Sequence, residues 1–410
     1  MFVISNNNTR LPIKIWLNDI SEIESSCLEQ AYNLSNLPFI HKWVSLMPDT
    51  HTGFGMPIGG VIATDGVIIP NAVGMDIGCG MAFISTDINI SDIEDIQTGN
   101  GSFIQAVIGD ILRNIPVGFN HYKEKQGSQT LDKANECLDM YIENKGLVEQ
   151  IGNGYYQIGT LGGGNHFIEL QVDESGNIGI MVHSGSRNFG LQICKYYNKI
   201  AKSHNEKWYS SVPGNYSLAF LPVDHRDGIN YIKWMNLALD FAYENRSIIL
   251  SKAKEILERY IAKYTNITFS YGQEINCHHN YASLEHHFNK NVWVHRKGAT
   301  RARLGEIAAI PGAMGSYSYI VEGLGNEHSF YSSSHGAGRK YSRKGAMANF
   351  STESVMLDLK EQNVAIGKHN KSDIAEESRF AYKDIDTVMA SQKDLVKPIK
   401  KLKTIGVVKG

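Results

Sequence analysis

Two patterns of hydrophobic and polar positions alternate along the 410 residues of this chain. The first pattern is glycine-rich: in residues 53–85, 158–190 and 298–326, short runs of Val, Ile and Phe are broken by Gly, Asn and Pro. Such runs between turn residues are typical of β-strands joined by tight loops. We therefore expect these three stretches to form sheet, with glycine loops that hold the chemistry.

One hairpin and one strand can be predicted within these stretches. Val61–Ile62 and Val67–Ile69 are separated by Thr64-Asp65-Gly66, and an Asp-Gly pair between two apolar runs favours a β-hairpin. Ile178–Val182 is a continuous apolar run, which indicates a buried strand. We therefore expect His183, which follows directly, at the end of a strand.

The second pattern is helical. In residues 226–264, apolar side chains recur at roughly helical spacing with charged side chains between them. This segment predicts one long helix or a helical hairpin that packs on the core, and its simplest role is that of a scaffold. Residues 129–150 and 384–403 predict two further surface helices.

No linker, repeat or low-complexity run divides the chain. We therefore expect residues 1–410 to form a single large domain, with the helical segment at about 226–264. The predicted fold class is α+β, in which mixed β-sheets carry glycine-rich loops and helices flank them.

The composition narrows the class of protein. Hydrophobic residues make up 42% of the chain and charged residues 20%, which is ordinary for a globular protein with a buried core. The formal net charge is −2, so the chain is not a polycation that coats nucleic acid, and RNA binding would need a local basic patch. Five scattered cysteines without CxxC spacing, no signal-peptide pattern and no apolar stretch of membrane-spanning length predict a cytoplasmic protein with no membrane partner.

Five residues stand in contexts that favour a metal site. Asp76 and Cys79 have D-x-x-C spacing, which lets one turn aim a carboxylate and a thiolate at one point. His166 follows three glycines, His183 ends the predicted strand, and His279 follows another histidine. Divalent metals accept all three ligand types, and a thiolate can bridge two ions. The set suits two open sites with room for a phosphate, but spacing alone leaves open whether the five residues meet.

His335 lies in a loop of small residues, 332–338. The glycines of this loop leave backbone N–H groups accessible to phosphate oxygens, and Arg339, Arg343 and Lys344 follow closely. A histidine in such a loop can be a metal ligand, a general acid or base, or a covalent nucleophile on phosphorus. The sequence alone leaves all three roles open.

A second basic cluster spans residues 295–303, where basic and small residues alternate. This cluster predicts either a rim that binds phosphates or a solvated turn. The apolar loop at 311–315 has a flexible backbone that suits the close approach of a ligand.

Eight short motifs occur in one order along the chain. They are His51-Thr-Gly-Phe-Gly-Met-Pro-Ile-Gly-Gly, Val73-Gly-Met-Asp76-Ile-Gly-Cys79-Gly, Gly162-Gly-Gly-Asn165-His166-Phe-Ile-Glu169, His183-Ser-Gly-Ser-Arg187, His279-Asn280-Tyr-Ala, Pro311-Gly-Ala-Met-Gly315, His335-Gly-Ala-Gly-Arg339 and Val408-Lys409-Gly410. Each motif is weak alone, but the ordered set resembles the RtcB family of RNA-splicing ligases over nearly the whole chain. The resemblance implies an RtcB-like fold with one catalytic domain.

The resemblance also implies an activity, that of an RNA ligase dependent on GTP and Mn²⁺. Such enzymes join an RNA 2′,3′-cyclic phosphate or 3′-phosphate end to a 5′-hydroxyl end through a GMP-histidine intermediate, in tRNA splicing or RNA repair. His335 matches the histidine that carries GMP. The partner is then RNA with broken ends, and whether an activating protein is needed stays open.

Site residues can be carried over position by position. Asp76, Cys79 and His166 match the ligands of one Mn²⁺, and Cys79, His183 and His279 match those of a second, so Cys79 would bridge the two ions. The positions that match GTP contacts are Asn165, His166, Phe167, Ile168, Glu169, His279, Asn280, Pro311, Gly312, Ala313, Met314, Ser318, His335, Gly336, Ala337, Gly338 and Lys409. Four candidates for RNA phosphates are chosen by composition rather than by match: Arg187, Arg296, Arg301 and Arg303.

The chain departs from the usual pattern of the family in a few places. The family loop usually reads Pro-Gly-Ser-Met-Gly, and Ala313 here lacks the hydroxyl that could bond a phosphate. Ser334 replaces a common cysteine, and residues 119–122 and 369–379 also differ. Ala313 motivates an alternative function, a metal-dependent RNA phosphoesterase or cyclic-phosphate hydrolase with weak ligation. A non-catalytic RNA-binding protein is a third interpretation, and the intact His335 argues against it.

Overall fold

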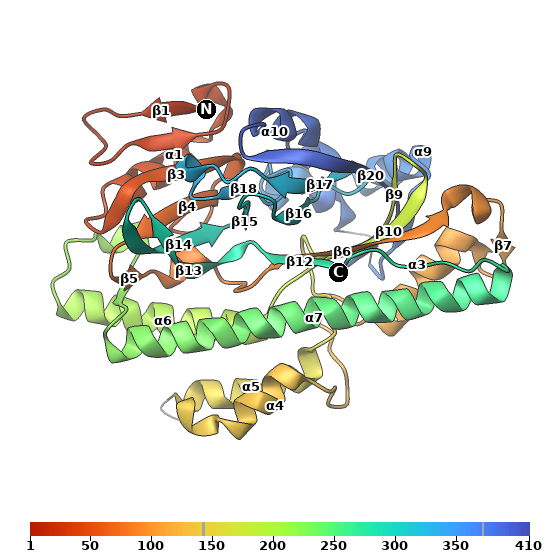
Figure 1. The fold of residues 1–410 in the computed structure, drawn as a ribbon, viewed down its shortest axis with the longest axis horizontal. Coiled ribbons are helices and arrows are strands. Elements are labelled where there is room, and N and C mark those ends of the chain that lie inside the picture. The colour runs from red at the N-terminus through yellow and green to blue at the C-terminus, as the bar shows by residue number, and fades with distance from the viewer. Residues whose placement is uncertain (142–143, 371–372) are drawn as a thin grey trace.

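Two large β-sheets form the centre of the computed structural model, which describes residues 1–141, 144–370 and 373–410 (Figure 1). In the first sheet, neighbouring strands follow the order β1, β2, β3, β4, β14, β13. Only β2 and β3 run parallel in this sheet. These strands are β1 (Phe2–Ile4), β2 (Ile13–Ile15), β3 (Ile40–His51), β4 (Ile58–Thr64), β14 (Lys290–Lys297) and β13 (Asn280–His287).

The second sheet has the order β12, β6, β10, β9, β20, β17, β16, and a short strand, β19, pairs with β20. Its pairs are antiparallel except for β19 with β20. The strands are β12 (Ile275–His278), β6 (Gly80–Asn89), β10 (Asn177–Ser184), β9 (Phe167–Asp173), β20 (Val396–Lys409), β17 (Tyr317–Gly323), β16 (Ile307–Ile310) and β19 (Ala365–Gly367). The predicted strand that leads into His183 is confirmed as part of β10.

Helices lie outside the two sheets (Figure 1). The longest, α7 (Arg226–Tyr264), has 39 residues, which corresponds to about 58 Å, and it runs along one side of the molecule as one continuous helix rather than a hairpin. The other helices are α1 (Ser25–Ser35), α2 (Pro70–Val73), α3 (Phe103–Asn114), α4 (Gln129–Glu136), α5 (Lys145–Gln157), α6 (Arg187–Lys207), α8 (Arg343–Asn349), α9 (Thr352–Glu361) and α10 (Ile385–Ser391). The architecture is α+β, as the sequence predicts.

Both faces of the second sheet are buried. Successive side chains of a strand point to opposite faces, so β6 contributes to two separate cores. Ala82 packs in a cluster with α3 and α7, whereas Met81 and Phe83 pack in a cluster with α9. Because helices cover both faces, the ends of the strands are the part of this sheet that can hold a site.

The hairpin predicted around Thr64-Asp65-Gly66 is wrong. The chain does turn there, and Gly66 has a positive φ of 65°. However, β5 (Val67–Ile68) pairs with β11 (Leu221–Pro222) instead of folding back on β4, whose partners are β3 and β14. Local turn chemistry therefore placed the bend, but distant strands decided the pairing.

The surface helix predicted at 384–403 is also wrong. Helix α10 ends at Ser391, and residues 396–409 form the central strand β20. Pro398 lacks the N–H that a helix interior needs, and the β-branched residues that follow favour a strand.

The helix predicted at 129–150 is divided into α4 and α5, and residues 142–143 lie outside the described part of the chain.

Two further pairs of short strands complete the fold: β7 (Gln97–Thr98) with β8 (Gly101–Ser102), and β15 (Ala299–Arg301) with β18 (Ser332–Ser334). None of the described helices combines the length and apolarity that crossing a membrane requires.

Candidate active site

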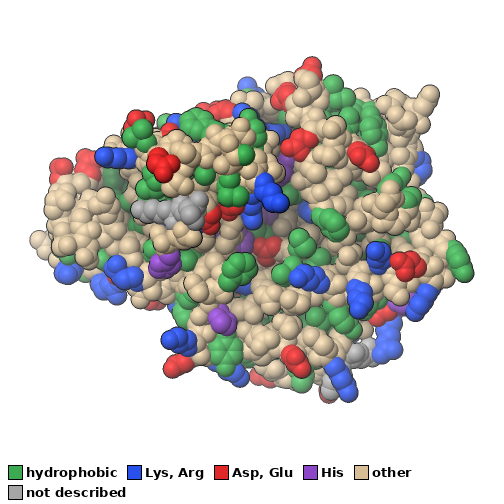
Figure 2. Space-filling model, turned by 180° about the vertical axis from the view of Figure 1, so that it is seen from behind, with side chains coloured by type: hydrophobic (Ala, Val, Ile, Leu, Met, Phe, Trp, Pro, Cys, Tyr) green, Lys and Arg blue, Asp and Glu red, His purple; other side chains and the backbone are tan. Residues whose placement is uncertain are grey.

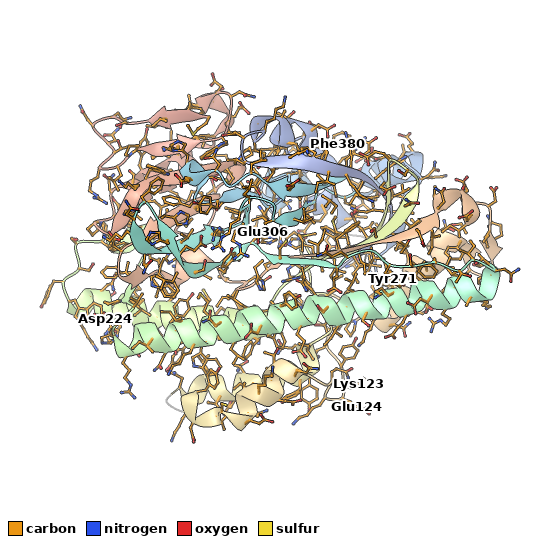
Figure 3. All side chains as sticks on the ribbon, viewed as in Figure 1. Lys123, Glu124, Asp224, Tyr271, Glu306 and Phe380 are labelled. Carbon is orange, nitrogen blue, oxygen red and sulfur yellow. The ribbon has the colours of Figure 1, made fainter. Side chains whose placement is uncertain are left out.

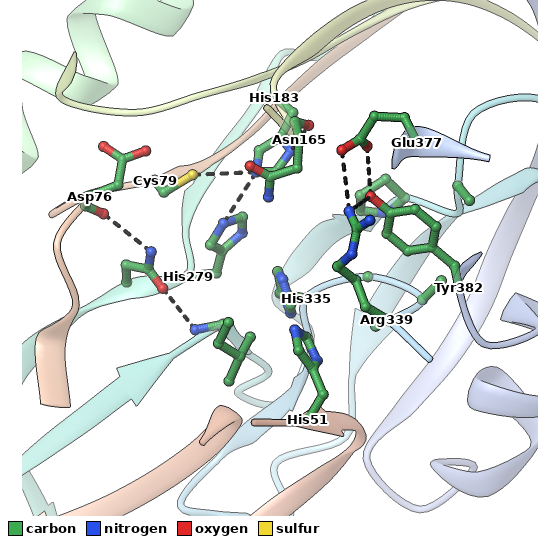
Figure 4. Close-up of a pocket in the computed structure, with 18 of the residues that line it drawn as sticks. His51, Asp76, Cys79, Asn165, His183, His279, His335, Arg339, Glu377 and Tyr382 are labelled. Carbon is green, nitrogen blue, oxygen red and sulfur yellow. Dashed lines mark hydrogen bonds and ion pairs between the residues drawn. The ribbon is translucent and has the colours of Figure 1, made fainter. Parts of the chain in front are cut away.

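A cavity of about 620 Å³ opens where strand ends from both sheets meet, and its walls come from segments far apart in the chain. On the face opposite to that of Figure 1, histidine and acidic side chains are visible inside a central hollow, with Lys and Arg side chains beside it (Figure 2). Figure 4 shows the cavity at close range. The motifs found in the sequence meet here because the two sheets bring their glycine loops together.

The five candidate metal ligands come from four separate segments. Asp76 and Cys79 lie in the turn between α2 and β6, and the backbone N–H of Cys79 donates to the carbonyl of Asp76. His166 precedes β9 and His183 lies near the end of β10, and these two strands are neighbours in the sheet. The backbone N–H of His279 donates to the carbonyl of Cys79 at 2.8 Å, which fixes the fifth residue beside the turn.

The side chains of these residues converge. Cys79 Sγ lies 3.4 Å from His166 Nε2 and 3.3 Å from His183 Nε2. His183 Nε2 lies 3.3 Å from His279 Nε2, and His166 Nε2 lies 3.0 Å from Asp76 Oδ2. Two possible ligand triads therefore share one sulfur: Asp76, Cys79 and His166, and Cys79, His183 and His279.

Hydrogen bonds at the far side of two rings decide which nitrogens are free. His166 Nδ1 lies 2.9 Å from the Leu161 carbonyl and His183 Nδ1 lies 3.0 Å from the Asn165 carbonyl, so each Nδ1 is the protonated donor. Their Nε2 atoms then carry lone pairs that face the other ligand atoms of the cluster. A buried set of converging lone pairs repels itself unless a cation lies among them, and this donor set fits a metal.

Burial shifts the pKa values of His183, His279 and Cys79 in directions that favour metal binding. Burial lowers the pKa of His183 and of His279 well below its usual value, which keeps both imidazoles neutral. Burial, together with the Asp76 carboxylate, raises the pKa of the Cys79 thiol well above its usual value. The thiolate therefore forms only when a cation offsets its charge.

A buried arginine stabilises the turn that holds Asp76 and Cys79. Arg246 in α7 donates to the carbonyls of Gly78 at 2.7 Å and Ser184 at 3.0 Å. It thereby fixes the backbone beside Cys79 and His183 at once. Burial lowers the pKa of Arg246 to about 10, so the guanidinium remains charged at neutral pH.

His335 lies just after β18 and lines the same cavity. Its Nδ1 lies 2.6 Å from Asp49 Oδ2, and the same oxygen accepts the backbone N–H groups of His335 and Gly336. Asp49 is fully buried, whereas the His335 side chain is 13% exposed. The carboxylate holds the proton on Nδ1 and leaves Nε2 with its lone pair. The centroids of the His335 and His279 rings lie 4.7 Å apart, so the His335 ring is next to the ligand cluster.

The loop around His335 passes close to Asp49 in a way that only glycine allows. Gly338 has a positive φ of 74°, and a Cβ on it would lie 2.2 Å from the Asp49 carbonyl. The small side chains therefore bring the backbone against β3. Burial lowers the pKa of the neighbouring His51 to about 4, so a neutral imidazole lines the cavity beside His335 (Figure 4).

Most positions expected to contact GTP line the cavity, and three do not. His166 is part of the ligand cluster, but its side chain does not line the cavity. Ile168 is fully buried in the core shared with α7, because side chains in β9 alternate between the two faces. The Ser318 hydroxyl accepts the backbone N–H of Gly312 at 3.2 Å and so supports the loop rather than the cavity.

A buried ionic network forms the wall near the end of β20 (Figure 4). Arg339 Nη1 lies 3.2 Å from Glu377, and Lys409 Nζ lies 3.1 Å from the same carboxylate. The hydroxyl of Tyr382 donates to Glu377 at 2.6 Å. Burial opposes ionisation, but Lys409 and Arg339 hold the pKa of Glu377 below its usual value.

Strand alternation separates two neighbours in the basic cluster at 295–303. Arg296 is fully buried, with its guanidinium bonded to Glu285, Tyr281 and backbone, so it cannot reach an RNA phosphate. Lys297 points to the other face and lines the cavity, where burial lowers its pKa to about 8. The sequence reasoning missed Lys297, although period-two alternation in β14 could have indicated it.

The other three candidate RNA arginines are dispersed. Arg187 is bonded to the Gly118 carbonyl and lies beside the ligand cluster. Arg301 is paired with Glu306, and Arg303 is half exposed on the surface. None of the three lines the cavity. Arg339, Glu377 and Tyr382 also line the cavity and were not assigned from the sequence. Asp49 was missed as well, because it acts on His335 from 286 residues away in the chain.

Comparison with known proteins is consistent with this geometry. Residues 30–410 match the family model described as tRNA-splicing ligase RtcB. The chain is 36% identical to the RNA-splicing ligase RtcB of Escherichia coli K12, over 97% of both chains. It is 30% identical to the tRNA-splicing ligase RtcB of Pyrobaculum aerophilum and 32% identical to that of Nanoarchaeum equitans, in each case over 98% of this chain and 95% of the relative.

Proposed function

Since the chain belongs to the RtcB family of RNA-splicing ligases, we propose that it uses GTP and two Mn²⁺ ions to join RNA ends. The ends would be a 2′,3′-cyclic phosphate or 3′-phosphate and a 5′-hydroxyl. One observation carries the proposal: His335, fixed by Asp49, faces two ligand triads that share Cys79. A nucleophile and a dinuclear site in one cavity suit phosphoryl transfer.

The two triads are the proposed holders of the metals. Asp76, Cys79 and His166 would bind one ion, and Cys79, His183 and His279 the other, with the Cys79 thiolate as a bridge. Two bound dications would offset the negative charge that builds up on the reacting phosphate. The hydrogen bonds of the Nδ1 atoms to backbone carbonyls support this assignment, because they aim each Nε2 lone pair into the cluster.

His335 is the proposed covalent nucleophile. Its Nε2 lone pair attacks the α-phosphorus of GTP, a P–N bond forms, and the bond to pyrophosphate breaks. The ring then carries a positive charge, which the Asp49 carboxylate at Nδ1 stabilises. A GMP-histidine intermediate splits one difficult condensation into easier steps.

The remaining steps transfer the guanylate to RNA. A 3′-phosphate oxygen attacks the same phosphorus, the P–N bond breaks, and the RNA end becomes an activated phosphoanhydride. The 5′-hydroxyl of the second RNA then attacks the 3′-phosphorus, loses its proton and expels GMP. A cyclic phosphate end must first be opened by water to a 3′-phosphate.

Glu169 is the proposed reader of the guanine base. The carboxyl group is buried in the cavity wall between Gln171 and Thr404, and burial raises its pKa to about 7. When ionised, it can accept from both the N1–H and the exocyclic amine of guanine, whereas adenine offers no donor at N1. This is our reason for proposing GTP rather than ATP.

Labelling with GTP tests the nucleophile. The wild-type chain, incubated with Mn²⁺ and α-labelled GTP, should acquire an acid-labile, alkali-stable label, and His335→Ala should acquire none. His286→Ala, which changes an exposed histidine of β13, is the matched control and should label normally. Absence of label on the wild type, or label that survives His335→Ala, would exclude the proposed intermediate.

A second candidate function rests on Ala313, which is buried in the wall of the cavity where the family usually has serine. Without that hydroxyl, the chain could act mainly as a metal-dependent RNA phosphoesterase or cyclic-phosphate hydrolase with weak ligation. Ligation and hydrolysis of the same cyclic-phosphate RNA can be measured together. Product that is only hydrolysed, and becomes ligated in Ala313→Ser, would favour this second function.

A further inference from the structure

Residues 208–225 connect α6 to α7 at one end of the molecule, where Asp224 is labelled in Figure 3. We call this segment the α6–α7 connection. Three side chains with metal-binding chemistry meet at its two ends: His204 in the last turn of α6, and His225 and Asp227 at the start of α7. None of them belongs to the cavity described above.

This cluster is remote from the candidate active site. Arg187, whose guanidinium lies 3.5 Å from His166, begins α6. His204 lies 17 residues further along the same helix, which corresponds to about 25 Å. The three side chains are therefore too far from the candidate active site to take part in its chemistry.

The ligand atoms are spaced for one small cation. His204 Nε2 lies 2.7 Å and His225 Nδ1 lies 3.7 Å from Asp227 Oδ2. All three ligand atoms lie within 4.8 Å of one another. Tetrahedral zinc with bonds of about 2.0 Å separates its ligands by about 3.3 Å. The two distances to Asp227 therefore each differ from that separation by about half an ångström.

Aromatic contacts hold both rings in place before any ion binds. The His204 ring stacks on Trp208 with centroids 4.8 Å apart and planes 2° apart. The His225 ring stands edge-on to both His204 and Trp208, at 5.0 Å and 5.6 Å. Since the imidazoles are already oriented, binding loses little side-chain freedom.

The three side chains are each between a fifth and two fifths exposed, so an ion and a water molecule can enter. Two imidazoles and one carboxylate plus water form a common zinc ligand set. The competing arrangement is a plain His204–Asp227 ion pair, with His225 Nδ1 accepting the backbone N–H of Asp227 at 3.2 Å as a helix cap. This cap hydrogen bond is long, so little is lost when His225 Nδ1 binds the ion and the backbone N–H of Asp227 bonds to water instead.

We propose that His204, His225 and Asp227 bind a zinc ion that fastens α6 to α7. The ion closes the α6–α7 connection into a loop, which stabilises the folded segment by lowering its freedom to open. Residues of this segment line a smaller cavity of about 290 Å³, which shares Phe54 and Asn71 with the main cavity. The ion thus steadies one wall beside the candidate active site without contacting it.

Zinc stoichiometry tests the proposal. The full chain is stripped with a chelator, titrated with Zn²⁺, and its bound zinc is measured by elemental analysis after gel filtration. After gel filtration, the wild type should hold one equivalent of zinc more than His225→Asn. In the titration, the Zn²⁺ affinity of this site should be at least roughly 100-fold lower in the variant. Asn is chosen because it retains a good helix cap, so the fold is preserved.

Two controls assign the extra equivalent. His286→Asn, an exposed histidine of β13, should bind as many ions as the wild type. Cys79→Ala should lose metal at the candidate active site and retain the His225-dependent equivalent, so this inference and the proposed function can fail separately. Equal zinc content in the wild type and His225→Asn, with no difference in the Zn²⁺-induced rise of Tm, would overturn the proposal.

Discussion

A histidine can attack phosphorus only through an unprotonated nitrogen, so the position of one proton decides what His335 can do. Asp49 holds that proton on Nδ1 from 286 residues away in the chain. The sequence identified His335 through the glycines beside it but carried no sign of Asp49. At the scale of the residue, the reactive group was therefore readable from local sequence and its orienting partner was not.

Replacing Asp49 with Asn keeps an oxygen that can accept from Nδ1 but removes the charge that stabilises the ring after the P–N bond forms. We expect GMP transfer from GTP to His335 to slow roughly 100-fold or more. Single-turnover labelling with α-labelled GTP measures this rate. Asp65→Asn, at the turn after β4, is the matched control, and equal rates for Asp49→Asn and the wild type would contradict the role of Asp49.

Glu169 links pH to stability. Because burial raises its pKa to about 7, the folded protein keeps a proton between roughly pH 4.5 and 7 that the unfolded chain has released. The unfolding free energy therefore falls as pH rises through this window, and the fall is complete above pH 7. Urea denaturation should show a larger fall from pH 5 to 7.5 in the wild type than in Glu169→Gln. Glu174→Gln, an exposed neighbour, should behave as the wild type.

The same titration affects nucleotide binding with the opposite sign. Only the ionised Glu169 carboxylate accepts two donors from guanine, so we expect GTP affinity to rise roughly tenfold from pH 6 to 8. Calorimetric titration at several pH values measures this. Glu169→Gln should bind GTP more weakly and without that pH dependence. A pH dependence that persists in the variant would assign it to another group.

At the scale of the element, α7 is more than the scaffold that its hydrophobic pattern predicts. Most of its buried residues do pack in the two cores beside it. Arg246 on the same helix, however, bonds the carbonyls beside Cys79 and His183. A periodic pattern indicates which face of a helix is buried. It does not indicate that one buried side chain is charged and donates hydrogen bonds to the backbone of a site.

Arg246→Met should therefore damage the metal centre as well as stability. It removes the charged donor shared by two buried carbonyls, and we expect the unfolding free energy to fall by about 3 kcal/mol or more. Mn²⁺ affinity should fall by roughly 10- to 100-fold, since the ligands lose their support. Urea denaturation and metal titration measure the two effects. Arg259→Met, an exposed arginine of the same helix, should change neither.

At the scale of the whole molecule, the net charge of −2 leaves RNA binding to local groups. Arg301 and Arg303 remain our proposed surface sites for RNA phosphates, although Arg301 is already paired with Glu306. Salt dependence distinguishes direct phosphate binding from mere proximity, because each neutralised phosphate releases counterions.

Replacing Arg301 and Arg303 with Ala should weaken RNA binding. We expect the slope of log affinity against log salt to become less steep by about 0.7 for each RNA phosphate that the variant no longer neutralises. Fluorescence titration of single-stranded RNA over a KCl series measures the slope. Replacing Lys195 and Lys199, exposed on α6, is the control, and an unchanged slope in the arginine variant would exclude both residues.

The sequence by itself determined the α+β class, the strand before His183, the long helical segment at 226–264 and the family. These follow from local periodicity and from ordered short motifs, which need no knowledge of distant residues. Only the tertiary structure decided that β5 pairs with β11, that 396–409 is a central strand, and that Arg296 is buried while Lys297 lines the cavity. Strand pairing, burial and proton positions depend on residues hundreds of positions apart, and no local pattern encodes them.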